Sequence, residues 1–559
     1  MLCDLYTAAG ENLTGTLWTV YPRPQMKRDS YLNLNGEWDF SVNYEKMGRI
    51  RVPFCPESKL SGIGNHYEEG ALLCYNRTFT LPEDFNRGRV ILHVGAADQR
   101  ADVFVNGKPA GTHKGGYEAF SFDITDYLQK ENMLQICCFD DLEDQSYPYG
   151  KQTLNRGGMW YTPVSGIWQT VWLESVPDNY IEKLHMENRG YGVTISIEPA
   201  LEGKVSVAEL GEFELTDGKV TITPENPHLW SPEDPFLYEF VIEAGEDRIA
   251  SYFAIRSLEI KKIGAYQRLC LNGKPYFFHG LLDQGYWPDG IFTPAAPVCY
   301  ADDIRMMKKL GFNTLRKHIK VEPEEFYYQC DKLGMIVWQD MVNNSDYNFF
   351  RDTALPTIGI QKLNDKHLHA NPYERKRFLE CMEATVNQLK NHPSICYWTI
   401  FNEAWGQFDS DNVYEQFKKL DDTRFIDSTS GWFRRNKTDV DSYHVYFKEV
   451  KLKAGKKPLV LSEFGGKTYK AEGHIFNPEK VYGYGGCETL DALNEAVAKL
   501  YTDEIIPTVK KGLCASIYTQ VSDVEDEING LLTYDRKVEK IKPEVMLPIA
   551  VALQQAIEE

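Results

Sequence analysis

The chain has 559 residues, with 61 Lys and Arg against 81 Asp and Glu, so its formal net charge is −20. Hydrophobic residues make up 43% and charged residues 25%, a balance typical of a globular protein, which excludes a largely disordered chain. An acidic chain repels phosphate backbones, so we expect no nucleic-acid partner. The 13% aromatic content is typical of proteins whose flat rings line a ring-shaped ligand, and also of large β-domains.

Targeting signals and cysteines indicate the compartment. No run of about 18 apolar residues occurs, so we expect no membrane-spanning helix and no membrane partner. The start, Met1-Leu2-Cys3-Asp4, lacks the basic segment and apolar core of a secretory signal. The 12 cysteines are scattered without a CxxC pair, and most lie in apolar runs, such as Cys396. We interpret them as reduced core residues of a cytoplasmic protein.

The first half of the chain predicts two β-domains. Short apolar or alternating runs at 88–94, 101–105, 133–139 and 170–174 are separated by turn signals such as Asn106-Gly107. This pattern favours a β-sandwich over residues 1–178. Runs at 193–197 and 219–223 continue the pattern over residues 179–262, a length typical of an immunoglobulin-like sandwich.

The pattern changes after about residue 263, where apolar runs alternate with helical periodicity. The clearest helix is expected at 371–391, where Leu379, Met382, Val386 and Leu389 share one face. Further helices are expected near 322–333, 412–420, 489–501 and 543–557. About eight apolar runs with helices between most of them predict a (β/α)8 barrel over residues 263–559.

Two of the apolar runs end in a glutamate. Residues 395–401 lead into Asn402-Glu403, and residues 458–462 lead into Glu463. In our count these are barrel strands four and seven, whose carboxyl ends meet at the same mouth. Two facing carboxylates suit glycosidic cleavage, in which one protonates the departing oxygen and the other attacks the anomeric carbon. The structural alternative is that each glutamate only caps its strand or pairs with an arginine.

Motifs along nearly the whole chain resemble those of glycoside hydrolase family 2. His392-Pro-Ser followed by Trp398-Thr-Ile-Phe-Asn-Glu403 is similar to the acid/base signature, and Leu461-Ser-Glu-Phe-Gly465 to the nucleophile strand. The segments 103–125 and 165–173 resemble the family's sugar-binding jelly roll, and 230–238 its middle sandwich. The resemblance implies a jelly roll, an immunoglobulin-like sandwich and a catalytic TIM barrel in this order.

The resemblance also implies roles for individual residues. Glu403 corresponds to the general acid/base and Glu463 to the nucleophile of a retaining mechanism. Asn402 is expected to donate to the sugar 2-hydroxyl, and Arg316 to keep Glu463 ionised. The remaining expected substrate contacts lie at or just after strand ends, and each has a structural alternative as a core or hydrogen-bonding residue: His318, His444, Tyr446, Asp283, Asp340, Trp405 and Tyr518.

The chain departs from the family pattern at three places. The segment 341–346 lacks the metal-binding residues of the known β-galactosidases, so we expect neither a metal nor another cofactor. The paired Asn-x-Lys positions of the known β-glucuronidases hold Glu527 and Asn529, which opposes binding of a uronic acid. Lys317 and Lys320, in an altered motif around Arg316, are alternative cations that leave acidic sugars open.

Three functions are compared on this basis. The leading hypothesis is an exo-acting, retaining β-glycosidase acting on a small carbohydrate with a terminal β-galactoside. The alternative enzyme is a β-glucuronidase or other β-hexuronidase. A non-catalytic carbohydrate-binding protein is the alternative of another class, but it has no use for the paired glutamates. The sequence leaves open whether the chain forms a homo-oligomer.

Overall fold

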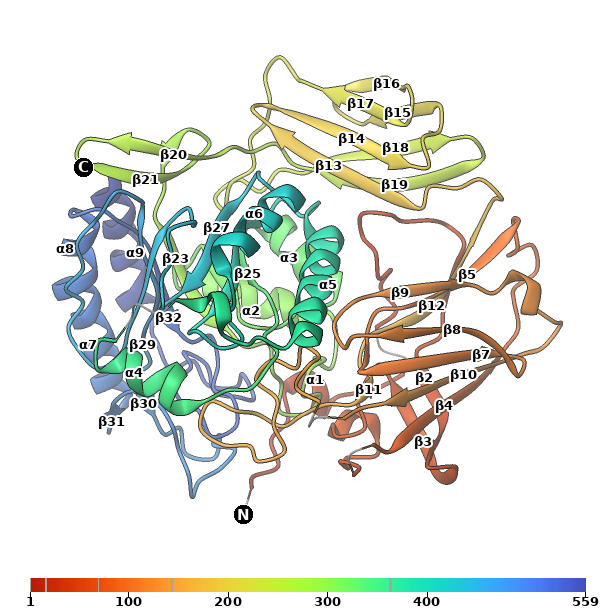
Figure 1. Ribbon diagram of the computed structural model, residues 1–559, viewed down its shortest axis with the longest axis horizontal. Helices are drawn as coiled ribbons and strands as arrows, with labels where there is room; N and C mark the ends of the chain where they lie inside the picture. Colours follow the sequence, from red (N-terminus) through yellow and green to blue (C-terminus); the bar gives the residue numbers. More distant parts are fainter. Residues whose placement is uncertain (1, 16–17, 69, 142–143, 361–363, 559) are drawn as a thin grey trace.

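A computed structural model describes residues 2–15, 18–68, 70–141, 144–360 and 364–558 of the chain. Two β-sandwiches and a (β/α)8 barrel follow one another, as predicted, and Figure 1 shows them in orange, yellow and green to blue. No helix in these described ranges is long and apolar enough to cross a bilayer.

The first sandwich consists of two antiparallel sheets whose inner faces share one apolar core. The sheet orders are β1-β12-β5-β9 and β3-β2-β4-β10-β7-β8, with β6 and β11 paired beside them. Burial alternates along strands such as β7, as expected for a sheet with one face in the core. The strands are β1 Tyr31–Asn33, β2 Gly36–Val42, β3 Glu45–Val52, β4 Leu72–Phe79, β5 Arg89–Val94, β6 Ala97–Asp98, β7 Arg100–Val105, β8 Lys108–Lys114, β9 Phe120–Asp123, β10 Asn132–Phe139, β11 Gly166–Ile167 and β12 Val171–Val176.

One pair of cysteines in this sandwich contradicts the expectation that all are reduced. Cys74 on β4 and Cys137 on β10 form a disulfide bond. The two residues are 63 positions apart in the sequence, but the antiparallel ladder places them directly opposite one another. Linear spacing cannot reveal this pairing, because it depends on the strand register. Cys396 and the other nine cysteines are free.

The second sandwich has the sheet orders β13-β14-β17 and β16-β15-β18-β19 around its own core. A hairpin-like sheet, β20-β21-β22, then leads into the barrel. The strands are β13 Lys183–Arg189, β14 Gly192–Glu198, β15 Gly203–Val207, β16 Gly211–Leu215, β17 Lys219–Ile222, β18 Tyr238–Ala244, β19 Asp247–Phe253, β20 Leu258–Ile263, β21 Tyr266–Leu271 and β22 Lys274–Pro275.

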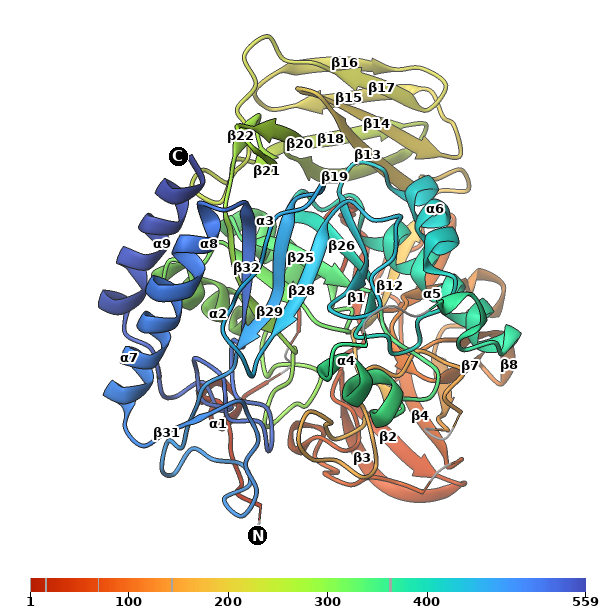
Figure 2. The same ribbon diagram turned by 60° about the vertical axis from the view of Figure 1, so that its left-hand side comes forward.

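The barrel is one eight-stranded parallel sheet with the order β27-β26-β25-β24-β23-β32-β29-β28. Every residue of β26 and of β29 is buried, because helices cover the outside of the barrel. Figure 2 shows β28, β29 and β32 side by side. In chain order the strands are β23 Phe278–Asp283, β24 Thr314–Lys317, β25 Ile336–Asp340, β26 Ile395–Asn402, β27 Phe425–Ser430, β28 Asp441–Val445, β29 Leu459–Gly465 and β32 Leu513–Thr519.

The barrel helices lie close to their predicted ranges. The longest, α5, begins after Asn371, whose side chain caps it by accepting from Tyr373 N, and Pro372 stands at its first position. The helices are α2 Val298–Lys309, α3 Glu324–Leu333, α4 Leu355–Thr357, α5 Pro372–Leu389, α6 Ser410–Leu420, α7 Leu490–Leu500, α8 Ile506–Val509 and α9 Pro543–Glu558. Short elements complete the chain: α1 Ala8–Glu11, β30 Thr468–Tyr469, β31 Gly486–Cys487, η1 Lys59–Ser61, η2 Thr125–Tyr127, η3 Phe350–Ala354, η4 Asp365–His367 and η5 Tyr501–Ile505.

Candidate active site

The two glutamates meet at the mouth of the barrel. Glu403 directly follows β26, the fourth barrel strand, and Glu463 lies in β29, the seventh. One carboxylate oxygen of each and Nδ1 of His444 all lie within 4.8 Å of one another. The side chain of Glu403 is 21% exposed and that of Glu463 only 5%, so the pair combines an accessible group with a buried one.

The backbone turns sharply at Glu403. Glu403 and Ala404 have φ angles of 53° and 65°, which are left-handed values that cost non-glycine residues about 1–2 kcal/mol each. The turn is fixed by the Glu403 N–H, which donates to Ser430 O at 3.0 Å, and by the Trp405 N–H, which donates to Asn402 O at 3.1 Å. Strain of this kind is typical of sites where the surrounding fold holds a side chain in a required direction.

Arg316, at the end of β24, uses all three nitrogens of its guanidinium group to bind Glu463 and the residues around it. Nη1 donates to Glu463 Oε1 at 3.1 Å and to Ser462 O at 3.0 Å. Nη2 donates to Asn402 Oδ1 at 2.8 Å, and Nε lies 3.0 and 3.1 Å from the two oxygens of Asp340. Arg316 is fully buried, so these charge-assisted bonds are not weakened by water.

Glu463 is held in its ionised form. Burial acts to raise its pKa, but the charges of His444 and then Arg316 outweigh burial and lower the pKa to about 2. The Tyr446 hydroxyl donates to Glu463 Oε2 at 2.6 Å and lies 2.9 Å from Thr519 Oγ1. An ionised, oriented carboxylate is the form that attacks carbon.

Glu403 shares a proton with His444. Ser430 donates its hydroxyl hydrogen to Ser462 Oγ at 2.9 Å, so it accepts from the His444 Nε2–H at 3.0 Å. Nδ1 of His444, which lies 2.7 Å from Glu403 Oε1, then either carries a second proton or accepts one from Glu403. In both cases one proton lies between the two side chains, where Glu403 can deliver it.

Asn402 and His318 retain groups that a sugar can bind. The Asn402 carbonyl accepts from Arg316, and no hydrogen bond to another described residue uses its NH2 group. The His318 Nδ1 lies 2.7 Å from Asp340 Oδ2, while burial, followed by the charge of Lys151, lowers the pKa of His318 to about 4. A neutral His318 that donates from Nδ1 presents Nε2 as an acceptor for a hydroxyl hydrogen.

Asp340 and Asp283, both expected to contact substrate, are engaged within the protein. Asp340 is 1% exposed and binds Arg316 and His318. Asp283 Oδ2 accepts from Lys317 Nζ at 2.7 Å, on the opposite side of β24 from Arg316. Lys317 also binds Glu322, so this group forms a separate ion cluster outside the catalytic pair.

Both aromatic residues expected to form walls of the sugar pocket are buried. Trp405 is 3% exposed, and its ring packs against Trp160 and Tyr149 of the first sandwich at centroid distances of 5.1 and 5.5 Å. Tyr518 is 1% exposed, and its hydroxyl accepts from Lys467 N at 3.1 Å. Neither ring lies open at the surface of the mouth.

Sequence reasoning did not single out Ser430, Thr519 and Lys151. Ser430 and Thr519 are the last residues of β27 and β32, so the rule that selected the glutamates at strand ends would have found them. Lys151 lies in the first sandwich, and no local signal in the barrel points to it. Its charge reaches Glu463 only because the two domains pack together.

Glu403, His444 and Glu463 are also the group in the described ranges with the spacing of a metal site. Two carboxylate oxygens and one imidazole nitrogen form a donor set suited to a divalent cation. The His444 Nδ1 already pairs with Glu403 at 2.7 Å, so a cation would have to displace the shared proton.

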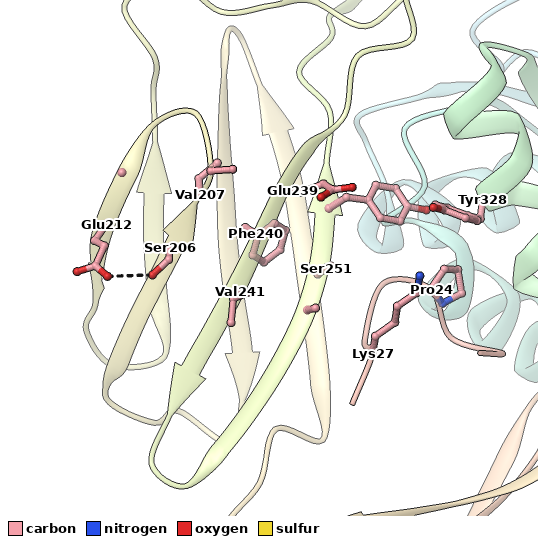
Figure 3. A pocket seen from close by; sticks show the side chains of 14 residues that line it. Pro24, Lys27, Ser206, Val207, Glu212, Glu239, Phe240, Val241, Ser251 and Tyr328 are labelled. Atoms are coloured by element: carbon pink, nitrogen blue, oxygen red, sulfur yellow. Dashed lines mark hydrogen bonds between the residues drawn. The ribbon is translucent and has the colours of Figure 1, made fainter. Parts of the chain in front are cut away.

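A groove of about 510 Å³ lies elsewhere, between the second sandwich and the barrel (Figure 3). Strands β15 and β18 and Tyr328 of α3 line it, together with Lys27 and Glu239. Its lining contains neither member of the catalytic pair, so the groove is separate from the site at the barrel mouth.

Three family models match successive parts of the chain. The model described as the TIM barrel domain of glycosyl hydrolases family 2 matches residues 262–546, about half of the chain. The sugar binding domain of the same family matches 62–177, and a third family 2 model matches 181–256. The chain belongs to glycosyl hydrolase family 2. As a family 2 protein with the paired glutamates in place, it is a glycoside hydrolase.

Individual relatives are distant and differ in their substrates. A β-glucuronidase of Bacteroides fragilis is 23% identical over 500 residues, covering 81% of this chain and 68% of the relative. A β-galactosidase of Thermoanaerobacter pseudethanolicus is also 23% identical, covering 72% of this chain and 54% of the relative. The solved β-D-glucuronidase of Dictyoglomus thermophilum has a TM-score of 0.72 at 19% identity and covers 96% of this chain and 98% of that one, which shows a shared fold.

Proposed function

We propose that this protein is an exo-acting, retaining β-glycosidase that removes one terminal β-linked sugar by double displacement. The observation that carries the proposal is the pair of carboxylates within 4.8 Å of one another in opposite environments. Arg316 keeps Glu463 ionised, and His444 shares a proton with Glu403. Inverting enzymes separate the two groups by about 6.5–9.5 Å to admit water, so this closeness favours retention.

In the first step Glu463 attacks the anomeric carbon while Glu403 protonates the departing oxygen. The bond from carbon to the aglycone oxygen breaks, a covalent bond to Glu463 forms, and the aglycone leaves as an alcohol. The proton that Glu403 delivers is the one it shares with His444 Nδ1 across 2.7 Å, so its departure leaves Glu403 as a carboxylate.

In the second step water cleaves the glycosyl-enzyme. Glu403, now a carboxylate, takes a proton from the water as it attacks the same carbon, and Glu463 leaves as a carboxylate. Two inversions give net retention. The Asn402 NH2 group is placed to donate to the sugar 2-hydroxyl, a contact that strengthens as the oxocarbenium ion develops. Tyr446 keeps Glu463 oriented through the 2.6 Å hydrogen bond.

The terminal sugar has two candidates. A β-galactoside is consistent with the β-galactosidase among the named relatives and with Glu527 and Asn529 at the positions where the known glucuronidases carry their Asn-x-Lys pair. A β-hexuronide is consistent with the β-glucuronidases among the relatives and with the charge of Lys151 near Glu463. A non-catalytic binding protein would not require the strained, proton-sharing arrangement at Glu403.

The experiment is a panel of nitrophenyl β-glycosides that includes the galactoside, glucoside, glucuronide and galacturonide. We expect turnover of at least one of them, and proton NMR of the early reaction should show the β-anomer of the free sugar before mutarotation. The matched Glu463→Gln variant should release no sugar. Early appearance of the α-anomer would contradict double displacement, and inactivity on the whole panel would favour a non-catalytic protein.

A further inference from the structure

A loop of the first sandwich reaches the active site and is fixed there by backbone hydrogen bonds. This loop, between β10 and β11, places the N–H groups of Tyr149 and Gly150 on one acceptor, Asn343 O, at 3.1 and 3.2 Å. The Tyr149 hydroxyl donates to Ser345 O at 2.8 Å. Asn343 and Ser345 follow the third barrel strand, β25, so the loop is held by the rim of the barrel mouth.

The same contacts determine where Lys151 lies. Gly150 has a φ of 65°, and a Cβ atom at this position would lie 3.0 Å from Ile319 O, so the loop backbone touches the residue after His318. On the other side, Lys151 O accepts from Tyr161 N at 3.0 Å, and the Tyr161 hydroxyl donates to Glu527. Lys151 therefore lies at the barrel mouth between the segment of His318 and the segment of Glu527.

The charge of Lys151 acts on three groups of the site. Burial raises the pKa of Glu527, and Lys151 is the strongest influence that opposes the rise. Burial lowers the pKa of His318, and Lys151 lowers it further. Lys151 also adds to the effect of His444 and Arg316 in lowering the pKa of Glu463. These effects agree with the backbone contacts in placing Lys151 on the side of the barrel mouth that holds His318, Glu463 and Glu527.

The other basic residues near Glu463 are already bound to groups of the protein. Arg316 is shared among Glu463, Asp340 and Asn402, and His318 is bound to Asp340. Lys317 and Lys320, which the sequence offered as alternative cations, are both 1% exposed and bound to Glu322. They are unavailable to a substrate.

Lys151 differs from these cations because it is free to bind a ligand. Over the described ranges its side chain has no hydrogen bond or ion pair with another residue, and it is only partly buried. An ammonium group close to an active site and without a protein partner is suited to bind an anionic group of a substrate.

Glu527 does not cancel this charge. Tyr161 and Asn529 both donate hydrogen bonds to it, the latter at 2.9 Å, so both of its oxygens are occupied. Burial raises the pKa of Glu527 above its ordinary value, while Lys151 and the hydrogen bonds from Tyr161 and Asn529 act to lower it. The two oxygens of Glu527 are therefore held by Tyr161 and Asn529, and neither forms an ion pair with Lys151.

We propose that Lys151 is a specificity-determining residue whose ammonium group binds the carboxylate of a terminal β-hexuronide. This inference rests on the proposed glycosidase function and selects the acidic sugar from its two candidates. The sandwich domain thereby supplies the cation that the barrel positions 527 and 529 lack. The substrate carboxylate has to reach the side of the mouth between His318 and Glu527.

The test measures kcat/KM of the full chain and of Lys151→Met on nitrophenyl β-glucuronide, β-galacturonide, β-galactoside and β-glucoside. We expect the wild type to hydrolyse at least one of the two uronides and Lys151→Met to lose about 100-fold on it, with neutral glycosides changed less than about threefold. Lys151→Arg should keep most uronide activity. Lys467→Met is the matched control, since its ammonium group lies beside Gly485 and Cys487, and it should not discriminate between the two classes.

The outcomes separate the two proposals. Equal losses on acidic and neutral substrates, uronide turnover insensitive to Lys151→Met, or a wild type active only on neutral glycosides would overturn the role of Lys151 and leave the glycosidase proposal standing. Inactivity of the wild type on every glycoside, with unchanged thermal unfolding in all variants, would overturn both.

Discussion

Two ion clusters lie on opposite sides of the second barrel strand and begin at adjacent residues. Arg316 binds Asp340 and Glu463 on one side, whereas Lys317 binds Asp283 and Glu322 on the other. Successive side chains of a strand point in opposite directions, so a single residue step separates a group in the active site from a group that supports the fold.

The clusters differ in how completely their charges are matched. Asp283 and Glu322 are served by two lysines, Lys317 and Lys320, in a closed set. Arg316 is divided between two carboxylates, Asp340 and Glu463, and Glu463 lies beside the more exposed Glu403. We infer that the Arg316 cluster, in which carboxylates outnumber cations, supports catalysis. The Lys317 cluster, in which two lysines balance two carboxylates, supports the stability of the fold.

The largest expected effect on activity comes from replacing Arg316, and replacing the adjacent Lys317 in a second variant provides the comparison. Arg316→Met should lower kcat/KM by about 1000-fold or more, because it leaves Glu463 and Asp340 buried without their cation. Lys317→Met should lower the unfolding temperature while the folded protein keeps kcat/KM within about tenfold. Kinetics and thermal unfolding of both variants measure the difference, and equal catalytic losses would remove the distinction between the clusters.

Replacement of the proton-sharing glutamate should give a loss that depends on the leaving group. Glu403→Ala should reduce turnover about 100- to 1000-fold for poor leaving groups, which need a proton to depart. Nitrophenyl or dinitrophenyl glycosides with good leaving groups should lose much less in the first step. A series of aryl glycosides measures this dependence, and losses that are the same along the series would contradict the acid role.

A smaller effect is expected in the pH dependence of stability. The pKa of Glu463 is lowered from its ordinary 4.5 to about 2, so its ionised form stabilises the native state above pH 4.5, and this contribution is lost as the pH falls toward 2. The wild type should lose about 2 kcal/mol through this group between pH 6 and pH 3. Urea unfolding should show that Glu463→Gln lacks this part of the loss. Equal losses in both proteins would contradict the strong ionisation of Glu463.

The fold and the meeting of Glu403 and Glu463 at one end of the barrel could be predicted because their signals are local. The runs ending at Glu403 and Glu463 mark strand ends, and parallel strands in a barrel bring their carboxyl ends to one face. Arg316 lies at another strand end, and the structure places it against Glu463 as expected.

The surroundings of the other expected site residues could not be predicted from their positions at strand ends. Asp283 ends its strand as Asp340 does, but it pairs with Lys317 outside the catalytic network. The sequence did not show that Tyr518 and Trp405 would be almost completely buried. The Cys74–Cys137 disulfide and the approach of Lys151 depend on strand register and on domain packing, which spacing along the chain does not reveal.

The most direct measurement of the central claim is to trap the glycosyl-enzyme with a 2-deoxy-2-fluoro β-glycoside of the sugar that the panel selects. Peptide mass spectrometry should find the sugar on the peptide that contains Glu463, and Glu463→Gln should remain unlabelled. Glu403→Ala should still be labelled by a fluoroglycoside with a good leaving group. A label on Glu403 or Glu527, or an undiminished label in Glu463→Gln, would contradict the account.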